Sequence, residues 1–146
     1  MYCQRLVPLL EQGLERNPTT VKVVYKNFPL QNHKFARKAA AAALAADRQG
    51  KFWPFHDRLF DSYNKLSDEK IQEIAVSLGL NMEAFTNDLK NPAIQTKIQQ
   101  DFQDGNRADV RGTPAVYING RVLKNRTLAG FQEIIDKELK KISGKK

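Results

Sequence analysis

The sequence predicts an α/β fold, in which helices pack on a small sheet, and three observations point to it. The segment 21–25 is rich in β-branched and aromatic residues, which indicates a strand. A long helical block follows, from about residue 34 to residue 108. Asn119-Gly120 then lies between the apolar segments 115–118 and 121–123, a pattern that predicts a β-hairpin. Because helices must bury their apolar stripes, we expect the three strands to form one sheet on which helices pack.

Two amphipathic helices are expected to cover this sheet. Leucines recur every four residues over 4–16, and Asn17-Pro18 ends that helix. Thr127 can cap a last helix over 128–142, whose apolar residues form one stripe. The two helices flank the sheet in sequence, so their apolar stripes can both be buried against it.

The helical block contains five helices separated by turn signals. An alanine-rich stretch over 36–46 and an aromatic stretch from Phe52 predict the first two. The remaining signals are Gly50 and Gly79 as helix ends and Ser67, Asn81 and Asn91 as N-caps. No shift in composition separates the block from its surroundings. We therefore expect a single domain over 1–146, with 34–108 as a helical insertion within it.

Composition and charge exclude several functional classes. The chain has 146 residues and no apolar run near the roughly 20 residues that span a membrane. Its first six residues lack the layout of a signal peptide. The net charge is +8, but residues 137–146 hold five lysines and one glutamate, which accounts for half of it. The other basic stretch has no interleaved aromatic residues, so we expect solvated basic surface and no nucleic-acid partner.

Cys3 is the only cysteine, so the chain cannot form an internal disulfide. It lies at the start of the first predicted helix, where backbone N–H groups favour a negative charge. Its position is compatible with a reactive thiol and equally with a structural one. His33 and His56 have no Cys/His signature or metal-ligand spacing around them, and we expect structural roles for both.

Thr113-Pro114 precedes the hairpin and follows Gly112. An X-Pro bond is the common place for a cis peptide, although a trans proline that opens an edge strand is the more frequent case. The residues alone leave both forms open.

Three segments together resemble the DsbA-like family of thioredoxin-fold thiol–disulfide oxidoreductases. Tyr2-Cys3-Gln4-Arg5, with Pro8 five residues after the cysteine, resembles the end of the family's C-P-x-C motif, with Met1 in place of the proline. Gly112-Thr113-Pro114 and the hairpin resemble its cis-proline segment. The stretch from Lys26 to Leu30 and the alanine-rich helix resemble its second strand end and helical insertion.

The resemblance implies a thioredoxin fold with a helical insertion between the second strand and the cis-proline strand, and with the first strand missing. Cys3 would be the resolving cysteine, and the nucleophilic cysteine would be absent. Thr113, Pro114 and Tyr2 would bind substrate, with the Thr113–Pro114 bond cis and close to Cys3. The family uses no metal or cofactor for this exchange.

The implied function is thiol–disulfide exchange on protein cysteines with a redox partner protein, in the periplasm or another extracytoplasmic space. One thiol cannot cycle between dithiol and disulfide, so the chain as given would be incomplete and inactive as a dithiol enzyme. Two alternatives remain open: a redox-inactive peptide-binding module, and a glutathione-dependent isomerase or transferase of the same fold. Whether the reaction runs as oxidation, reduction or isomerisation also stays open.

A missing first strand has a physical consequence. In the thioredoxin fold it lies between the strands that here are 21–25 and 115–118, so both would have unpaired backbone edges. Open edges recruit other chains. We therefore expect a homodimer or a strand swap through these edges.

Overall fold

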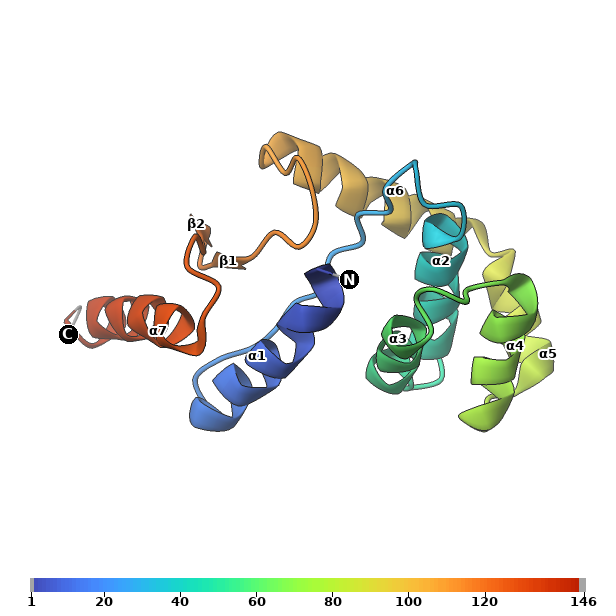
Figure 1. Ribbon diagram of the computed structural model, residues 1–146, viewed down its shortest axis with the longest axis horizontal. Helices are drawn as coiled ribbons and strands as arrows, with labels where there is room; N and C mark the ends of the chain where they lie inside the picture. Colours follow the sequence, from blue (N-terminus) through green and yellow to red (C-terminus); the bar gives the residue numbers. More distant parts are fainter. Residues whose placement is uncertain (1, 145–146) are drawn as a thin grey trace. The chain divides into compact units, whose positions relative to one another are not determined.

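The computed structural model describes residues 2–144 and contains a small hairpin among seven helices (Figure 1). The elements are α1 (Tyr2–Arg16), α2 (Ala36–Asp47), α3 (Phe52–Asp61), α4 (Asp68–Ser77), α5 (Met82–Leu89), α6 (Pro92–Arg107), β1 (Tyr117–Ile118), β2 (Arg121–Val122) and α7 (Leu128–Ser143). They form two compact units. The terminal unit comprises the chain up to residue 25 and from residue 112 onward, and the helical unit comprises residues 26–111.

The hairpin of the terminal unit has the predicted turn. Asn119 and Gly120 have φ angles of 48° and 78°, the left-handed backbone that a two-residue type I′ turn requires. β1 and β2 pair antiparallel, with Tyr117 opposite Val122 and Ile118 opposite Arg121. The Leu123 N–H donates to the Val116 carbonyl at 2.8 Å, which adds one bond beyond the two strands.

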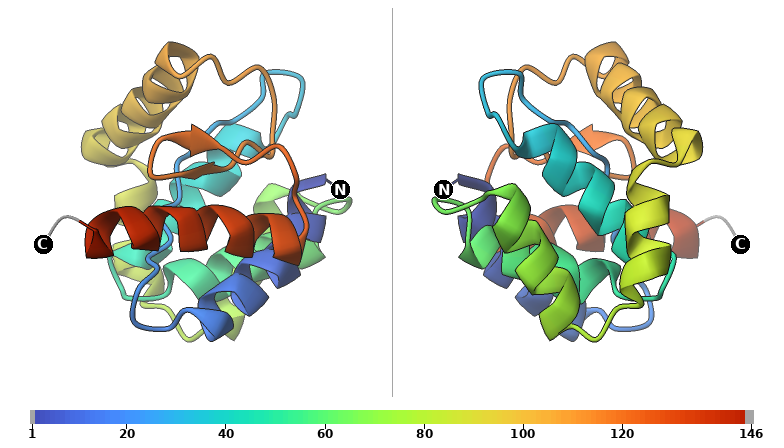
Figure 2. Two further views of the ribbon diagram at one scale, coloured as in Figure 1. Left: turned by 90° about the vertical axis from the view of Figure 1, so that its left-hand side faces the viewer. Right: turned by 90° about the vertical axis from the view of Figure 1, so that its right-hand side faces the viewer.

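The core of the terminal unit lies where α1, α7 and the hairpin meet. Leu123, Phe131 and Ile135 are buried there, and α1 contributes Leu6 and Leu10. Figure 2 shows α1 and α7 packed side by side in this unit. α7 begins at the predicted cap, because the Thr127 hydroxyl accepts a hydrogen bond from the Gly130 N–H at 3.1 Å.

The prediction of a strand at 21–25 is wrong. The sheet in the described chain has only two strands, β1 and β2, and no backbone hydrogen bond links residues 22–24 to another described residue. Burial nevertheless alternates along this segment, as in a strand, since Val21 and Val23 are half-buried whereas Lys22 and Val24 are exposed. A strand needs a ladder partner as well as an alternating pattern. The hairpin strands are likewise shorter than the predicted 115–118 and 121–123.

The helical unit is organised around α2. The alanines of α2 are largely buried, and their small side chains let α3, α5 and α6 approach closely. Phe55 and Phe85 are fully buried, with ring centroids 5.7 Å apart. The three predicted N-caps are confirmed: the side chains of Ser67, Asn81 and Asn91 accept hydrogen bonds from Lys70, Ala84 and Ala93 N–H groups at 3.1, 2.9 and 2.9 Å. Within the described part of the chain, no helix combines the length and apolar character needed to cross a bilayer.

Candidate functional site

Cys3 lies in the first turn of α1, and its thiol is free and half-buried. Its neighbour Tyr2 is 69% exposed, so a large aromatic side chain lies open to solvent beside the cysteine. Met1, which stands where the resembled motif has proline, lies outside the described residues. The predicted position of Cys3 at the start of a helix is therefore confirmed.

Thr113 and Pro114 lie between α6 and β1, in a segment without regular secondary structure. Both are half-buried, and the Thr113–Pro114 peptide bond is cis, the form that the family resemblance implied. Cys3, Tyr2, Thr113 and Pro114 all belong to the terminal unit. No backbone hydrogen bond among the described residues joins Cys3 to Thr113 or Pro114, so their proximity stays a prediction.

The chemistry open to this set of residues is that of one thiol. Cys3 can form or resolve one mixed disulfide, and the segment around Thr113 presents an irregular backbone whose groups can contact an extended polypeptide. No group of three or more metal-ligating side chains occurs between Tyr2 and Gly144.

His56 belongs to the helical unit and is packed among aromatic rings. Its Nδ1 lies 2.9 Å from the Asp57 Oδ1, and its ring centroid lies 4.6 Å from that of Phe60 and 5.4 Å from that of Trp53. The residue is 7% exposed. These contacts fit the structural role expected for it.

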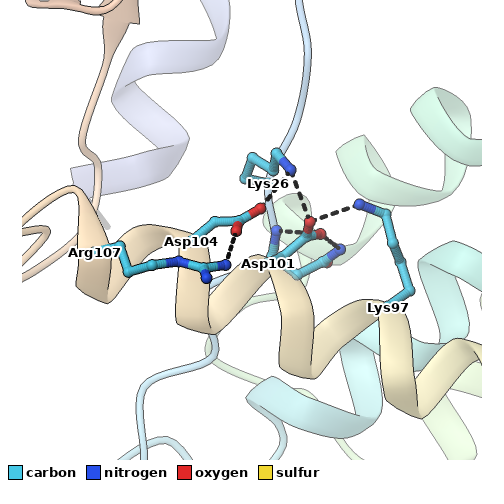
Figure 3. Close-up of polar contacts among 6 residues, drawn as sticks. Lys26, Lys97, Asp101, Asp104 and Arg107 are labelled. Carbon is cyan, nitrogen blue, oxygen red and sulfur yellow. Dashed lines mark hydrogen bonds and ion pairs between the residues drawn. The ribbon is translucent and has the colours of Figure 1, made fainter.

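A buried carboxylate, Asp101 on α6, was not among the residues predicted from the sequence, and it is only 1% exposed (Figure 3). Its Oδ2 accepts hydrogen bonds from the Asn27 N–H at 3.1 Å and from the Asn27 Nδ2 at 2.9 Å. Its Oδ1 lies 2.6 Å from the Lys97 Nζ and 3.2 Å from the Lys26 Nζ. One signal could have found it: Asp101 follows Ile94 and Ile98 on the buried stripe of α6, where a carboxylate needs partners.

The charged groups of this cluster shift one another's pKa values. Burial raises the pKa of Asp101, but hydrogen bonds from Lys97, from the Asn27 backbone and side chain, and from Lys26 outweigh it and hold the pKa below its ordinary value. Hydrogen bonds from Lys26 and Arg107 lower the pKa of Asp104. The bonds to Asp104 and Asp101 raise the pKa of Lys26. Each of these groups is therefore held in its charged form.

Comparison with known proteins identifies the family. A family model described as Thioredoxin matches residues 1–137. A Bacillus anthracis protein named "Probable disulfide bond formation protein D" is 32% identical over 129 residues, covering 83% of this chain and 59% of that protein. A Salinispora tropica protein named as a Na(+)/H(+) antiporter NhaA is 33% identical over 121 residues, but the match covers only 18% of it. The chain thus spans less than two thirds of the length of these relatives.

Two solved structures have the same fold. A thioredoxin-like oxidoreductase from Silicibacter pomeroyi superposes with a TM-score of 0.82 at 26% identity, over 95% of this chain and 80% of that one. The thiol-disulfide exchange protein alpha-DsbA2 from Wolbachia pipientis superposes with a TM-score of 0.81 at 23% identity, over 93% and 74%.

The chain therefore belongs to the thioredoxin family, and it shares its fold with a DsbA-like thiol–disulfide exchange protein. Its fold is the predicted α/β thioredoxin fold with a helical insertion, and it is mostly helical with a small sheet.

Proposed function

We propose that this chain takes part in thiol–disulfide exchange on protein cysteines, with Cys3 as the reacting thiol. The observation that carries the proposal is the position of Cys3 on the first turn of α1 in a chain of the thioredoxin family, in the same compact unit as Thr113 and Pro114. The assignment follows the family's chemistry, in which a thiolate exchanges with a disulfide through a mixed disulfide.

Cys3 carries out one exchange step, in the resolving role. Its thiolate attacks the sulfur of the nucleophilic cysteine in a mixed disulfide that joins this cysteine to a substrate. One S–S bond forms to Cys3, the old S–S bond breaks, and the substrate sulfur leaves as a thiolate that takes a proton from water. The nucleophilic thiol is not among these 146 residues, which hold a single cysteine. Full turnover therefore requires a second thiol, supplied by another segment or by a redox partner protein.

Tyr2, Thr113 and Pro114 are proposed to bind the substrate chain. Tyr2 is largely exposed next to Cys3, where its ring can cover apolar groups that flank a substrate cysteine. The segment at Thr113 leads into β1, and its backbone can pair with an extended peptide. Specificity would then come from backbone contacts, which suits an enzyme that acts on many proteins.

Further proposals concern organisation and location. The family match runs through both units, which supports one domain over 1–146 with 34–108 as its insertion. An extracytoplasmic location, such as the periplasm, suits disulfide chemistry because disulfides persist in oxidising compartments. The backbone of residues 22–24 makes no hydrogen bond to another residue that the structure describes, which supports self-association through this segment.

The single cysteine favours one rival function, a redox-inactive peptide-binding module of the same fold. The two functions differ in whether Cys3 forms a covalent bond.

The chain is incubated with glutathione disulfide and with a peptide disulfide, and adducts are detected by intact-protein mass spectrometry. We expect adducts with the wild-type chain and none with the matched variant Cys3→Ser. Binding of the peptide by both proteins without any adduct would support the binding module and contradict the exchange function.

A further inference from the structure

One side of the β2 backbone is open to a further strand. Hydrogen-bonded and non-hydrogen-bonded pairs alternate along an antiparallel ladder. Because the Leu123 N–H donates to the Val116 carbonyl at 2.8 Å, the adjacent pair, Val122 with Tyr117, is a non-hydrogen-bonded one. The N–H and carbonyl of Val122 therefore point away from β1, and no third strand lies beside β2 in the described sheet. Val122 is 53% exposed, so an extended peptide can reach these groups.

A groove of about 470 Å³ follows this edge, and all of its lining belongs to the terminal unit. Val122 and Lys124 line it from the hairpin, and Ile134 and Lys137 line it from α7. Figure 2 shows the hairpin beside α7, and Leu123 packs there with the buried residues of that helix. A strand added beside β2 would direct every second side chain toward α7, where the half-buried Ile134 offers an apolar contact.

The groove and its border are positively charged. Four cations oppose two carboxylates, which leaves 4 − 2 = +2: Arg121, Lys124, Lys137 and Lys141 against Glu133 and Glu138. Both carboxylates already have partners, because Glu133 pairs with Lys137, and Glu138 lies 3.0 Å from the Arg121 Nε and also pairs with Lys141. Lys124 has no carboxylate partner among the described residues. The charge therefore favours an acidic occupant.

A second copy of the same edge would be repelled. The segment 121–126 contains Arg121, Lys124 and Arg126 and no acidic residue. If two copies paired through this segment, their cations would lie across the ladder from one another, and such like-charge pairs are destabilising. An acidic strand would instead bring carboxylates next to these cations.

We propose that the β2 edge and this groove bind an extended acidic segment of a partner protein, which adds to the hairpin as a third strand. The Val122 backbone supplies main-chain hydrogen bonds, Ile134 contacts an apolar side chain, and Lys124 pairs with a carboxylate. The site contains neither Cys3 nor Thr113, so the inference is independent of the proposed exchange function.

The test measures binding of two short fluorescent peptides to the full chain by fluorescence anisotropy. One peptide alternates valine with glutamate, and the other has lysine in place of each glutamate. Neither contains cysteine, so exchange at Cys3 does not affect the result. We expect the acidic peptide to bind, with an affinity that falls as the salt concentration rises, and the basic peptide not to bind. Equal binding of the two peptides, or no binding of the acidic one, would overturn the inference.

Lys124→Glu tests the charge, because it replaces attraction by repulsion. We expect the dissociation constant of the acidic peptide to rise about fivefold or more. The matched control is Lys65→Glu, which makes the same change in net charge at an exposed lysine that does not line the groove. It should stay within about twofold of the wild type. Equal weakening by both variants would show that only the net charge matters, and the site would be wrong.

Val122→Pro tests the backbone pairing. Proline removes the outward N–H and is tolerated at an edge position whose N–H makes no bond within the sheet. We expect this variant to bind the acidic peptide about fivefold more weakly or worse, whereas Val122→Thr, which keeps the N–H and the branched shape, binds as wild type. Unchanged binding by the folded proline variant would contradict a third strand.

A modified peptide gives the same information if Val122→Pro does not fold. Two versions of the acidic peptide are made, each N-methylated at one of the two alternating sets of amides. Only one set faces β2 in a ladder, so we expect one version to lose binding to the wild-type chain and the other to retain it. Retention by both versions would overturn the inference.

Discussion

Asn17 and Gln132 form a reciprocal amide pair that joins the end of α1 to α7 across 115 positions of sequence. The Asn17 Nδ2 donates to the Gln132 Oε1 at 2.9 Å, and the Gln132 Nε2 donates to the Asn17 Oδ1 at 3.1 Å. Asn17 is 7% exposed and also donates to the Gly13 carbonyl at 2.9 Å. The pair fixes the helix that carries Cys3 against the last helix of the terminal unit.

Asn17→Ala should therefore destabilise the protein. It leaves the Gly13 carbonyl and the Gln132 amide without their partner, and we expect a loss of about 1–3 kcal/mol in the free energy of unfolding, measured by urea denaturation. Gln132→Ala should cost less, because Gln132 is less buried and its amide also donates to Asp136 at 2.8 Å. Additive effects in the double variant would contradict the claim that the two side chains act as a pair.

The fold requires glycine at position 130, because the backbone of Asn125 lies close to α7 there. A Cβ atom at Gly130 would clash with the Asn125 carbonyl oxygen, which belongs to the backbone and cannot rotate away. We expect Gly130→Ala to lower the midpoint of thermal unfolding, with a cost of about 1–3 kcal/mol for the forced shift.

Gly13→Ala is the matched control, because Gly13 is a helical glycine of the same unit and a Cβ atom there would meet no atom within 4 Å. Alanine has the higher helix propensity, so this variant should gain about 0.5–1 kcal/mol. Similar unfolding midpoints for the two variants would show that Asn125 gives way and that the contact does not constrain α7.

The pH dependence of stability should reflect Asp101. Its pKa in the folded protein is lowered from the ordinary value of 3.8, because the hydrogen bonds from Lys97, Asn27 and Lys26 outweigh the effect of burial. A carboxylate with a lowered folded-state pKa stabilises the protein above its unfolded pKa, and that contribution is lost as the pH falls through the folded pKa. Stability should therefore decrease below about pH 4.

Asp101→Asn should be less stable than the wild type at pH 7 and should lose less stability between about pH 5 and pH 2, measured by urea denaturation at each pH. Asp104 and Glu138 also have lowered pKa values, so part of the acid sensitivity should remain. An unchanged slope would show that Asp101 does not contribute through its charge.

The segment 22–24 should support self-association. Val24 is 67% exposed, and residues 22–24 make no backbone hydrogen bond to another described residue, so their backbone groups can pair with an extended segment of a second molecule. We expect the weight-average mass in sedimentation equilibrium to rise with concentration, and Val23→Pro to abolish the rise because proline removes a backbone donor. The control is Val76→Lys, which changes a valine that is 62% exposed on α4 and should behave as wild type. Lysine is used there because proline would break the helix. A monomer at all concentrations would contradict the proposal.

The parts of the fold that depend on local sequence could be predicted, and the parts that depend on distant partners could not. Ser67, Asn81 and Asn91 cap their helices through N–H groups two or three residues away, so short-range patterns sufficed. In the described part of the chain, residues 22–24 make no backbone hydrogen bond to a neighbouring strand, and a strand cannot form without one. Asp101 meets Asn27 across 74 positions of sequence, and only its place on an apolar stripe hinted at buried partners.

In the candidate site, too, the local features could be predicted and the contacts between distant segments could not. Cys3 at the start of a helix could be expected from the local pattern, and the cis Thr113–Pro114 bond from the family resemblance of the segment before the hairpin. The contacts that Asp101 makes with Asn27 and Lys26 could not, because they join segments far apart in the chain.

If the proposed function is correct, a substrate peptide joined to Cys3 lies along the Thr113 segment. The most direct measurement uses a peptide that carries a cysteine and a photoreactive group about two residues away, a spacing that keeps the group on the same face of an extended chain. The peptide is joined to Cys3 as a mixed disulfide, irradiated and mapped by mass spectrometry. We expect crosslinks within 113–117, and a marked loss of them in Thr113→Lys. Crosslinks confined to other segments, or an identical pattern in the Thr113 variant, would contradict the proposed function.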